Sequence, residues 1–153
     1  MKKIIVSACL LGCECRYDGK SKPCQKVLDL AKEKDTVLIP VCPEQMGGLS
    51  TPRVPSERQR SSKGQLRSIS RPGAVLMKDG RDVTAAYRKG AEMALPIAKL
   101  NGVKTAILKS GSPSCGKGII YDGSFSGRKD KGDGVTTQLF LSAGIDVLTE
   151  EEL

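Results

Sequence analysis

The sequence predicts an α/β fold, a three-layer sandwich built around a mostly parallel, Rossmann-like sheet. Short apolar runs rich in β-branched residues recur along the chain, as expected for buried parallel strands. Segments with helical periodicity separate these runs, and a strand–helix–strand order implies right-handed crossovers between parallel strands. At 153 residues, the chain is expected to form a single domain over residues 1–153.

The expected strands are the short apolar runs themselves. We expect strands at residues 3–8, 37–42, 74–77, 105–108 and 145–148. The first run, Ile4-Ile5-Val6, follows two lysines and mimics the start of a signal peptide. Because this run is short and is soon broken by Ser7 and Gly12, we interpret it as the buried first strand of a cytoplasmic protein.

Three segments with an apolar face at helical spacing lie between the strands. We expect helices at residues 25–33, 82–100 and 135–143. The longest helix is expected to begin with Asp82 as its N-cap and to kink at Pro96. Gly102 and Gly144 follow the second and third helices in the way that C′ residues do, and therefore mark their ends.

The segment Ser50–Gly73 interrupts this alternation. It has almost no apolar residues, and it carries six arginines or lysines against one glutamate. A structureless stretch of this length inside a compact domain is usually functional or disordered. Two interpretations stay open, a solvated flexible loop and a basic lid that orders over an anionic or polar substrate.

The chain contains no histidine and six cysteines. The lack of histidine excludes Ser-His-Asp and Cys-His catalysis, and it excludes zinc bound by histidine. Any metal held by side chains must therefore use thiolates, with or without carboxylates, and thiolates favour zinc or iron–sulfur clusters. In a chain without a convincing export signal, six cysteines indicate cytoplasmic thiols that bind metal or perform chemistry.

The composition also limits the classes of partner. A formal net charge of +8 attracts polyanions and small anions alike, although a merely soluble basic surface would explain it equally well. Aromatic residues make up only 3% of the chain and tryptophan is absent, which argues against a stacking platform for nucleic acid. No apolar run approaches the roughly 18 residues that a membrane span requires.

Three cysteines lie where three predicted strands end. Cys9 follows the first strand, Cys42 ends the second, and Cys115 lies in the turn "KSGSPSCGKG" after the strand at 105–108. Because ligands in open α/β sheets bind at the carboxyl ends of the strands, these thiols are expected to converge there. Each cysteine alone could be a small buried hydrophobe. Paired C-x-x-C knuckles and redox pairs are absent, which leaves a scattered three-cysteine site that would leave one corner of a cubane cluster open.

Polar residues beside these cysteines suggest a reactive site. Glu44 lies two residues after Cys42, and without histidine it is the natural proton carrier, although it could equally form a surface salt bridge. Ser112 and Ser114 supply hydroxyl groups in the turn before Cys115, and Ser112 could relay a proton. The sequence therefore predicts an acid–base group next to the thiols.

Four motifs then establish a family resemblance. The stretches "SACLLGCECRYDG", "PVCPEQMGGLSTPR", "KSGSPSCG" and "GSFSGRKDKGDGVTTQLFLSAGIDVL" resemble, in this order, the domain of unknown function 523 family. They extend from Ser7 to Leu148, which is nearly the whole chain. That family includes the thiouracil desulfidases, which carry a 4Fe–4S cluster bound by three cysteines.

The resemblance implies roles for individual residues. It assigns the cluster ligands to Cys9, Cys42 and Cys115. It assigns the catalytic glutamate to Glu44 and the catalytic serine to Ser112. Separately from the resemblance, Cys15 in "CRYDG" is expected as the alternative to Cys9. As a separate expectation, the residues lining the substrate pocket are Arg16, Tyr17, Gly48, Arg53 and Ser114, with Arg53 the candidate to contact a polar or anionic group.

The resemblance also implies a reaction and its partners. The expected activity is a redox-neutral desulfurisation of a thiolated nucleobase such as thiouracil, with the released sulfur passed to an acceptor. Two other classes fit the residues alone. One is a non-catalytic protein that uses the same thiols to bind or sense a metal, and the other is a basic RNA-associated protein whose 50–73 segment contacts phosphates.

Overall fold

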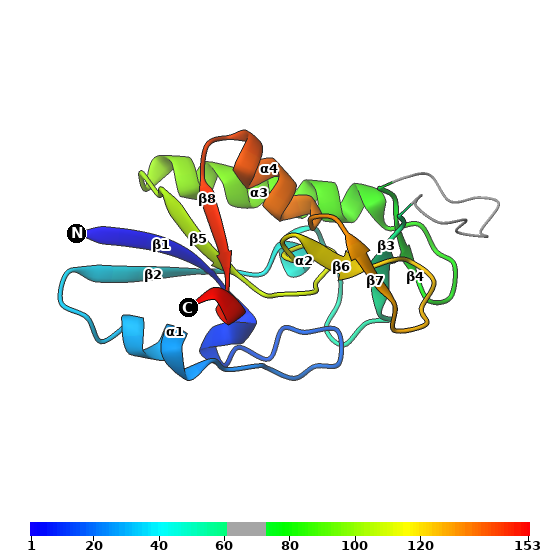
Figure 1. The fold of residues 1–153 in the computed structure, drawn as a ribbon, viewed down its shortest axis with the longest axis horizontal. Helices are drawn as coiled ribbons and strands as arrows, with labels where there is room; N and C mark the ends of the chain where they lie inside the picture. Colours follow the sequence, from blue (N-terminus) through cyan, green and yellow to red (C-terminus); the bar gives the residue numbers. More distant parts are fainter. Residues whose placement is uncertain (61–72) are drawn as a thin grey trace.

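A four-stranded parallel sheet forms the centre of the protein (Figure 1). The structure is a computed structural model, and it describes residues 1–60 and 73–153. The strand order is β2-β1-β5-β8. The strands are β1 (Lys2–Ser7), β2 (Thr36–Val41), β5 (Thr105–Leu108) and β8 (Asp146–Thr149). All three pairings in this sheet are parallel, as the alternating sequence pattern predicts.

Helices cover both faces of this sheet, which confirms the predicted three-layer α/β fold. One face packs on α1 (Gln25–Leu30), and the other packs on α3 (Thr84–Leu100) and α4 (Val135–Ser142) (Figure 1). The alternation along β1 separates the two cores, because Ile4 lies in the same buried cluster as Val27 of α1. Its neighbour Ile5 lies in the cluster of Ala94 from α3 and Phe140 from α4.

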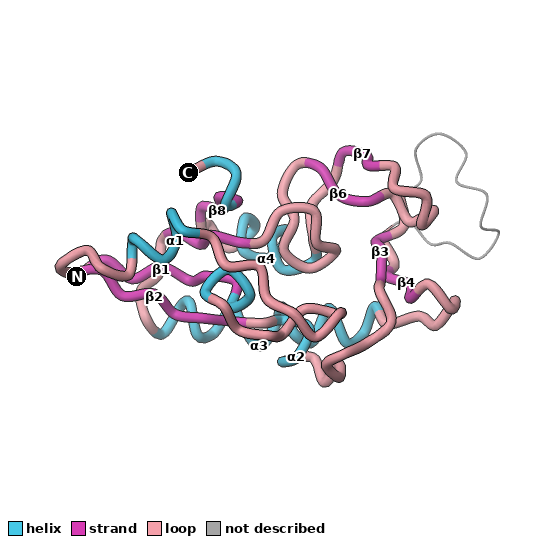
Figure 2. The backbone as a smooth tube through the Cα atoms, turned by 90° about the horizontal axis from the view of Figure 1, so that it is seen from below, coloured by secondary structure: helices cyan, strands magenta, loops and turns pink. Residues whose placement is uncertain are grey.

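The predicted strand at 74–77 was placed in the wrong sheet. It exists as β4 (Val75–Met77), but it pairs antiparallel with β3 (Ser56–Arg58). A second hairpin consists of β6 (Ile119–Tyr121) and β7 (Lys129–Lys131). Both hairpins lie at the end of the molecule toward which the parallel strands run (Figures 1 and 2). A three-residue apolar run indicates burial but does not identify the pairing partner.

The basic segment 50–73 is therefore only partly as predicted. Its residues 56–58 form β3, in a stretch for which no strand was expected. Residues 61–72 lie outside the described part of the chain, and with them half of the segment for which a basic lid was one interpretation.

Two expected features of α3 differ in detail. The N-cap residue is Val83, one residue later than predicted, but Asp82 still accepts hydrogen bonds from the Thr84 backbone N–H (2.9 Å) and hydroxyl (2.6 Å). Pro96 lies inside the helix, which continues to Leu100. Gly102 has the positive φ of 65° that is typical of a residue after a helix end.

A one-turn helix that the sequence did not reveal, α2 (Pro43–Met46), packs closely against α3. Two glycines permit this close approach. A Cβ added to Gly90 would lie 1.8 Å from the Pro43 carbonyl oxygen, and one added to Gly47 would lie 2.0 Å from the Ala86 carbonyl oxygen. The position of α2, and therefore of Glu44, is set by this contact between two backbones.

Candidate active site

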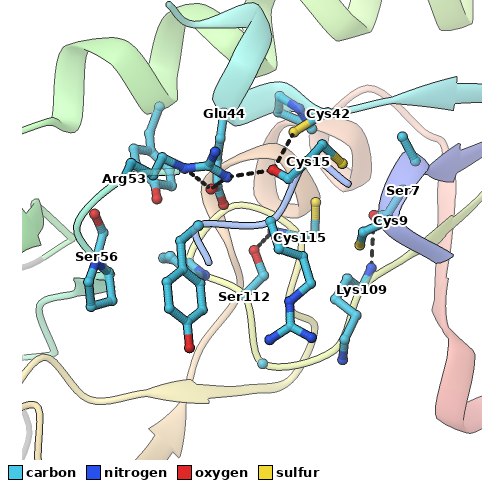
Figure 3. A pocket seen from close by; sticks show the side chains of 18 of the residues that line it. Ser7, Cys9, Cys15, Cys42, Glu44, Arg53, Ser56, Lys109, Ser112 and Cys115 are labelled. Atoms are coloured by element: carbon cyan, nitrogen blue, oxygen red, sulfur yellow. Dashed lines mark hydrogen bonds and ion pairs between the residues drawn. The ribbon is translucent and has the colours of Figure 1, made fainter. Parts of the chain in front are cut away.

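A cavity of about 360 Å³ lies at the carboxyl edge of the parallel sheet. Its walls come from the ends of β1 and β2, from the loop after β5 and from β3 (Figure 3). The lining includes four thiols, one carboxylate near them, several hydroxyl groups and three cations. These side chains belong to Cys9, Cys15, Cys42, Cys115, Glu44, Tyr17, Ser56, Tyr87, Ser112, Arg16, Arg53 and Lys109.

The structure places Cys9, Cys42 and Cys115 in the walls of this one cavity. Cys15 joins them, and the Cys42 thiol donates a hydrogen bond to the Cys15 carbonyl oxygen at 3.7 Å. Cys13 is exposed, and neither it nor Cys24 lines the cavity. All six cysteines are free thiols. Among the described residues, no group of three or more cysteine or acidic side chains is arranged to hold a single metal ion.

Three thiols of the cavity, those of Cys15, Cys42 and Cys115, are held in their protonated form. Burial raises the pKa of Cys115 to about 12. At Cys15, the hydrogen bond with the Cys42 thiol lowers the pKa, but the hydrogen bond with Cys9 and burial outweigh it and raise the pKa to about 11. The pKa of Cys42 is raised by its interaction with the Cys15 thiol and by burial. Binding of a metal centre to these thiols would therefore release protons.

Arg53 holds Glu44 in place. Its guanidinium donates to Glu44 Oε2 from both Nε (2.9 Å) and a terminal nitrogen. The other N–H groups donate to the carbonyl oxygens of Cys15 (3.0 Å) and Ser50 (3.1 Å), and to the Thr51 hydroxyl (3.1 Å). These five hydrogen bonds use every donor of the guanidinium, whose side chain is only 4% exposed.

Two consequences follow from this arrangement. First, Arg53 has no N–H group left for a substrate, so its position favours a role in orienting Glu44 over direct substrate contact. Second, both of its bonds to the carboxylate fall on Oε2, which leaves Oε1 as the oxygen that Arg53 does not hold. The charge of Glu44 also raises the pKa of Arg53, against the effect of burial.

Ser112 shapes the loop that carries Cys115. Its hydroxyl oxygen accepts hydrogen bonds from the backbone N–H groups of Ser114 and Cys115, both at 3.1 Å. Because the two lone pairs are engaged, the hydroxyl proton of Ser112 is available to donate. Ser114, in contrast, is buried outside the cavity lining, and its hydroxyl pairs with that of Thr136 at 2.9 Å. Ser114 therefore anchors the loop to α4.

The remaining predicted pocket residues divide into two groups. Arg16 and Tyr17 line the cavity, and Arg16 lies 5.8 Å from the centroid of the Tyr17 ring. Tyr17 is 43% exposed, so this pair forms part of the cavity rim. Gly48 is exposed in the turn after α2 and does not line the cavity.

Sequence reasoning did not identify several hydroxyl groups of the cavity wall, among them those of Ser56 and Tyr87. Ser56 comes from β3 and Tyr87 from α3, and both line the cavity. Neither residue lies at the end of a parallel strand, where ligand-binding residues of an open α/β sheet are expected. The helical spacing around Tyr87 indicates a buried face, and this signal is the same for a core residue and for a cavity residue.

The fold and the site together define an α/β protein whose thiol-rich cavity lies at the ligand-binding edge of a parallel sheet. The family model described as 2-thiouracil desulfurase matches residues 4–152, and the chain belongs to this family. The family resemblance predicted from the four motifs is thereby confirmed.

Two individual proteins resemble the whole chain. The uncharacterized protein YbbK of Bacillus subtilis (strain 168) is 43% identical over 150 residues, which cover 98% of this chain and 97% of that protein. A solved structure, described as the [4Fe-4S]-dependent thiouracil desulfidase TudS (DUF523Vcz), matches with a TM-score of 0.84 and 44% identity. This match covers 100% of the present chain and 93% of the solved one.

Proposed function

We propose that this protein is an iron–sulfur cluster-dependent desulfidase that removes sulfur from thiolated nucleobases such as thiouracil. The observation that carries the proposal is the meeting of Cys9, Cys42 and Cys115, from three separate strand ends, with Glu44 at one cavity. Membership of the 2-thiouracil desulfurase family and the likeness to a [4Fe-4S]-dependent thiouracil desulfidase support this assignment.

The side chains of the cavity fit a 4Fe–4S cluster in their chemistry. Iron–sulfur clusters are held by cysteine thiolates, and four free thiols line this cavity in a chain without histidine. We assign the ligands to Cys9, Cys42 and Cys115, with Cys15 as the alternative to Cys9. When bound through three cysteines, the cluster supplies an iron without a protein ligand, which acts as a Lewis acid toward the substrate sulfur.

Glu44 and Ser112 supply the proton chemistry. Oε1 of Glu44 takes a proton from the water that attacks the thiocarbonyl carbon, while Arg53 keeps the carboxylate oriented through Oε2. The Ser112 hydroxyl donates a hydrogen bond to the substrate. Overall a C–S bond breaks, a C–O bond forms from water and sulfur leaves as hydrogen sulfide, so no electrons are gained or lost.

The cavity rim provides the remaining substrate contacts. Arg16 and Tyr17 line the entrance and would contact the heterocycle directly. Ser114 and Gly48 would contribute indirectly, because Ser114 anchors the Cys115 loop and Gly48 permits the turn that follows Glu44. Hydrogen sulfide would pass to a sulfur acceptor.

The cellular setting follows from the thiols. We propose a cytoplasmic location, because a reducing compartment keeps free thiols available for cluster assembly. In the described part of the chain, no helix has the length and apolar character needed to span a membrane. We also propose that residues 1–153 form one domain.

Anaerobic reconstitution with iron and sulfide tests this function. We expect wild-type protein to take up about four irons per chain and to develop the visible absorption of a cluster. Cys9→Ala, Cys42→Ala and Cys115→Ala should each lose this uptake. Cys13→Ala and Cys24→Ala are matched controls, since these thiols do not line the cavity, and they should retain it.

The loaded wild-type protein should then convert 2-thiouracil to uracil and sulfide in equal amounts. If the Cys9 variant retains iron and Cys15→Ala loses it, Cys15 is the ligand instead. Stoichiometric zinc in anaerobic preparations, with no iron uptake, would overturn the desulfidase and favour a protein that binds or senses metal.

A further inference from the structure

One hydroxyl group in the cavity has no role in the reaction described above. Tyr87 lies on α3 and its side chain is 2% exposed, yet it lines the cavity. Burial, followed by the charge of Glu44, raises the pKa of Tyr87. The hydroxyl therefore stays protonated and can donate a hydrogen bond into the site. Tyr87 lines the same cavity as Glu44 and Cys115, so it belongs to the reactive part of the site.

A second hydroxyl lies beside it. Ser56 Oγ is buried, faces the Tyr87 hydroxyl and forms no hydrogen bond of normal geometry with any described residue. Its backbone is fixed in β3, opposite Met77 of β4. Ser56 is therefore placed to orient the Tyr87 hydroxyl at the cavity wall, where a ligand can complete the hydrogen bonding of the pair.

The two charged groups closest to this argument, Arg53 and Glu44, have their own assignments. Arg53 has used all five of its N–H groups, and Glu44 can only accept while it is ionised. The Tyr87 hydroxyl is therefore a buried, uncharged hydrogen-bond donor in the same cavity as Glu44, and Ser56 lies beside it. A neutral donor next to a carboxylate suits an acceptor on the substrate, such as a carbonyl oxygen.

We propose that the Tyr87 hydroxyl, positioned by Ser56, donates a hydrogen bond to a ring carbonyl oxygen of the bound heterocycle. The site would then select thiopyrimidines that carry a carbonyl group over those that lack one, because a buried donor is left unpaired by the wrong ligand. This inference rests on the proposed desulfidase function and adds a determinant of its substrate class.

Tyr87→Phe tests the inference, because it removes the hydroxyl and keeps the ring that fills the wall. Reconstituted wild type and variant would be compared on 2-thiouracil, which has a ring carbonyl, and on 2-thiopyrimidine, which has none. We expect the wild-type preference for 2-thiouracil in kcat/KM to fall by about 5- to 30-fold in the variant, the loss typical of one hydrogen bond. Ser56→Ala should shift the preference in the same direction by a smaller factor.

Binding of uracil by calorimetry gives a second measurement that needs no turnover. The Kd for uracil should rise by about 5- to 30-fold in Tyr87→Phe. Met93→Leu is the control, since Met93 lies on the same helix as Tyr87, is 45% exposed and does not line the cavity, and it should behave like the wild type. Equal iron content and equal thermal stability would exclude an indirect effect.

The possible results separate the two proposals. An unchanged substrate preference and an unchanged uracil Kd in Tyr87→Phe would overturn the role of Tyr87, even if the wild type removes sulfur from thiouracil. Failure of the wild type to act on thiouracil would overturn the proposed function, and the uracil Kd would still decide the role of Tyr87. If the wild type does not bind uracil, the inference also falls.

Discussion

At the scale of single residues, the hydrogen bonds of Arg53 bear on the role that its position suggests. An arginine near the expected substrate pocket is a natural partner for a polar or anionic group. The sequence therefore predicts that Arg53 contacts such a group of the substrate. In the structure its guanidinium donates five hydrogen bonds to four acceptor atoms of the protein itself. The sequence shows that an arginine is present, but it does not show which acceptors the fold places around its guanidinium. The use of every N–H group by the protein itself could therefore not have been predicted.

The first prediction follows from that arrangement. Arg53→Lys keeps the positive charge but loses the paired hydrogen bonds to Glu44 Oε2. Because Glu44 would lose its fixed orientation, we expect kcat for 2-thiouracil to fall by about 10- to 100-fold with little change in KM. Steady-state kinetics on reconstituted protein of equal iron content measures both constants.

Arg88→Lys is the control for Arg53→Lys, because Arg88 is exposed on α3 and lies outside the cavity. It should leave both constants unchanged. A large rise in KM with unchanged kcat in Arg53→Lys would instead return Arg53 to the role of a substrate-binding residue.

At the scale of elements, the sequence indicated the parallel strands and the long helices because each has a period or an apolar run. The short elements α2, β3 and β7 have no period and no apolar run, and the aliphatic run of β6 is only two residues long, which is why these elements were not predicted. For the same reason β4 was recognised as buried but assigned to the wrong sheet. These short elements nevertheless position Glu44, Ser56 and one side of the cavity.

The contact between α2 and α3 leads to the second prediction. In Gly90→Ala, the new Cβ would lie 1.8 Å from the Pro43 carbonyl oxygen, and neither backbone can yield without moving its helix. We expect the free energy of unfolding to fall by about 1–3 kcal/mol, as in other overpacked cores. We also expect iron retention to decrease, because Cys42 is the N-cap residue of α2.

Urea unfolding and iron counting measure the two effects of Gly90→Ala. Lys89→Ala, at the neighbouring exposed position of the same helix, should change neither quantity. Wild-type stability in Gly90→Ala would contradict the view that this backbone contact fixes the position of α2.

At the scale of the whole molecule, the topology explains how much of the site was predictable. Parallel strands end at a common edge, so the positions of Cys9, Cys42 and Cys115 in the sequence were sufficient to predict that they meet. The approach of Cys15 was not predictable in this way, because it depends on the path of a loop. That loop is held by the bond from Arg53 to the Cys15 carbonyl oxygen.

The chain end also contributes to the site, since it braces the loop that leads to Cys115. Glu150 follows β8, and its carboxylate accepts hydrogen bonds from Lys109 Nζ (2.6 Å) and from the N–H and hydroxyl groups of Ser110 (both 2.8 Å). Burial alone would raise the pKa of Glu150, but these bonds outweigh it and lower the pKa below 4.5. The last strand is thereby tied to the cavity wall.

The third prediction concerns the hydrogen bonds that the Glu150 carboxylate accepts and their dependence on pH. Glu150→Gln removes the charge from three hydrogen bonds, and we expect the free energy of unfolding at neutral pH to fall by about 1.5–3 kcal/mol. Because the folded-state pKa is lowered, the contribution of the wild-type carboxylate is present above pH 4.5 and is lost as pH falls through the folded-state value. The difference between variant and wild type should therefore shrink in acid.

Urea unfolding of the two proteins at neutral pH and at successively lower pH measures this difference. Glu92→Gln, at an exposed position on α3, is the control and should show no pH-dependent difference from wild type. A difference for Glu150→Gln that stays constant as the pH falls would mean that the carboxylate charge does not stabilise the loop. A neutral side chain at position 150 would then stabilise the Cys115 loop as well as the carboxylate does.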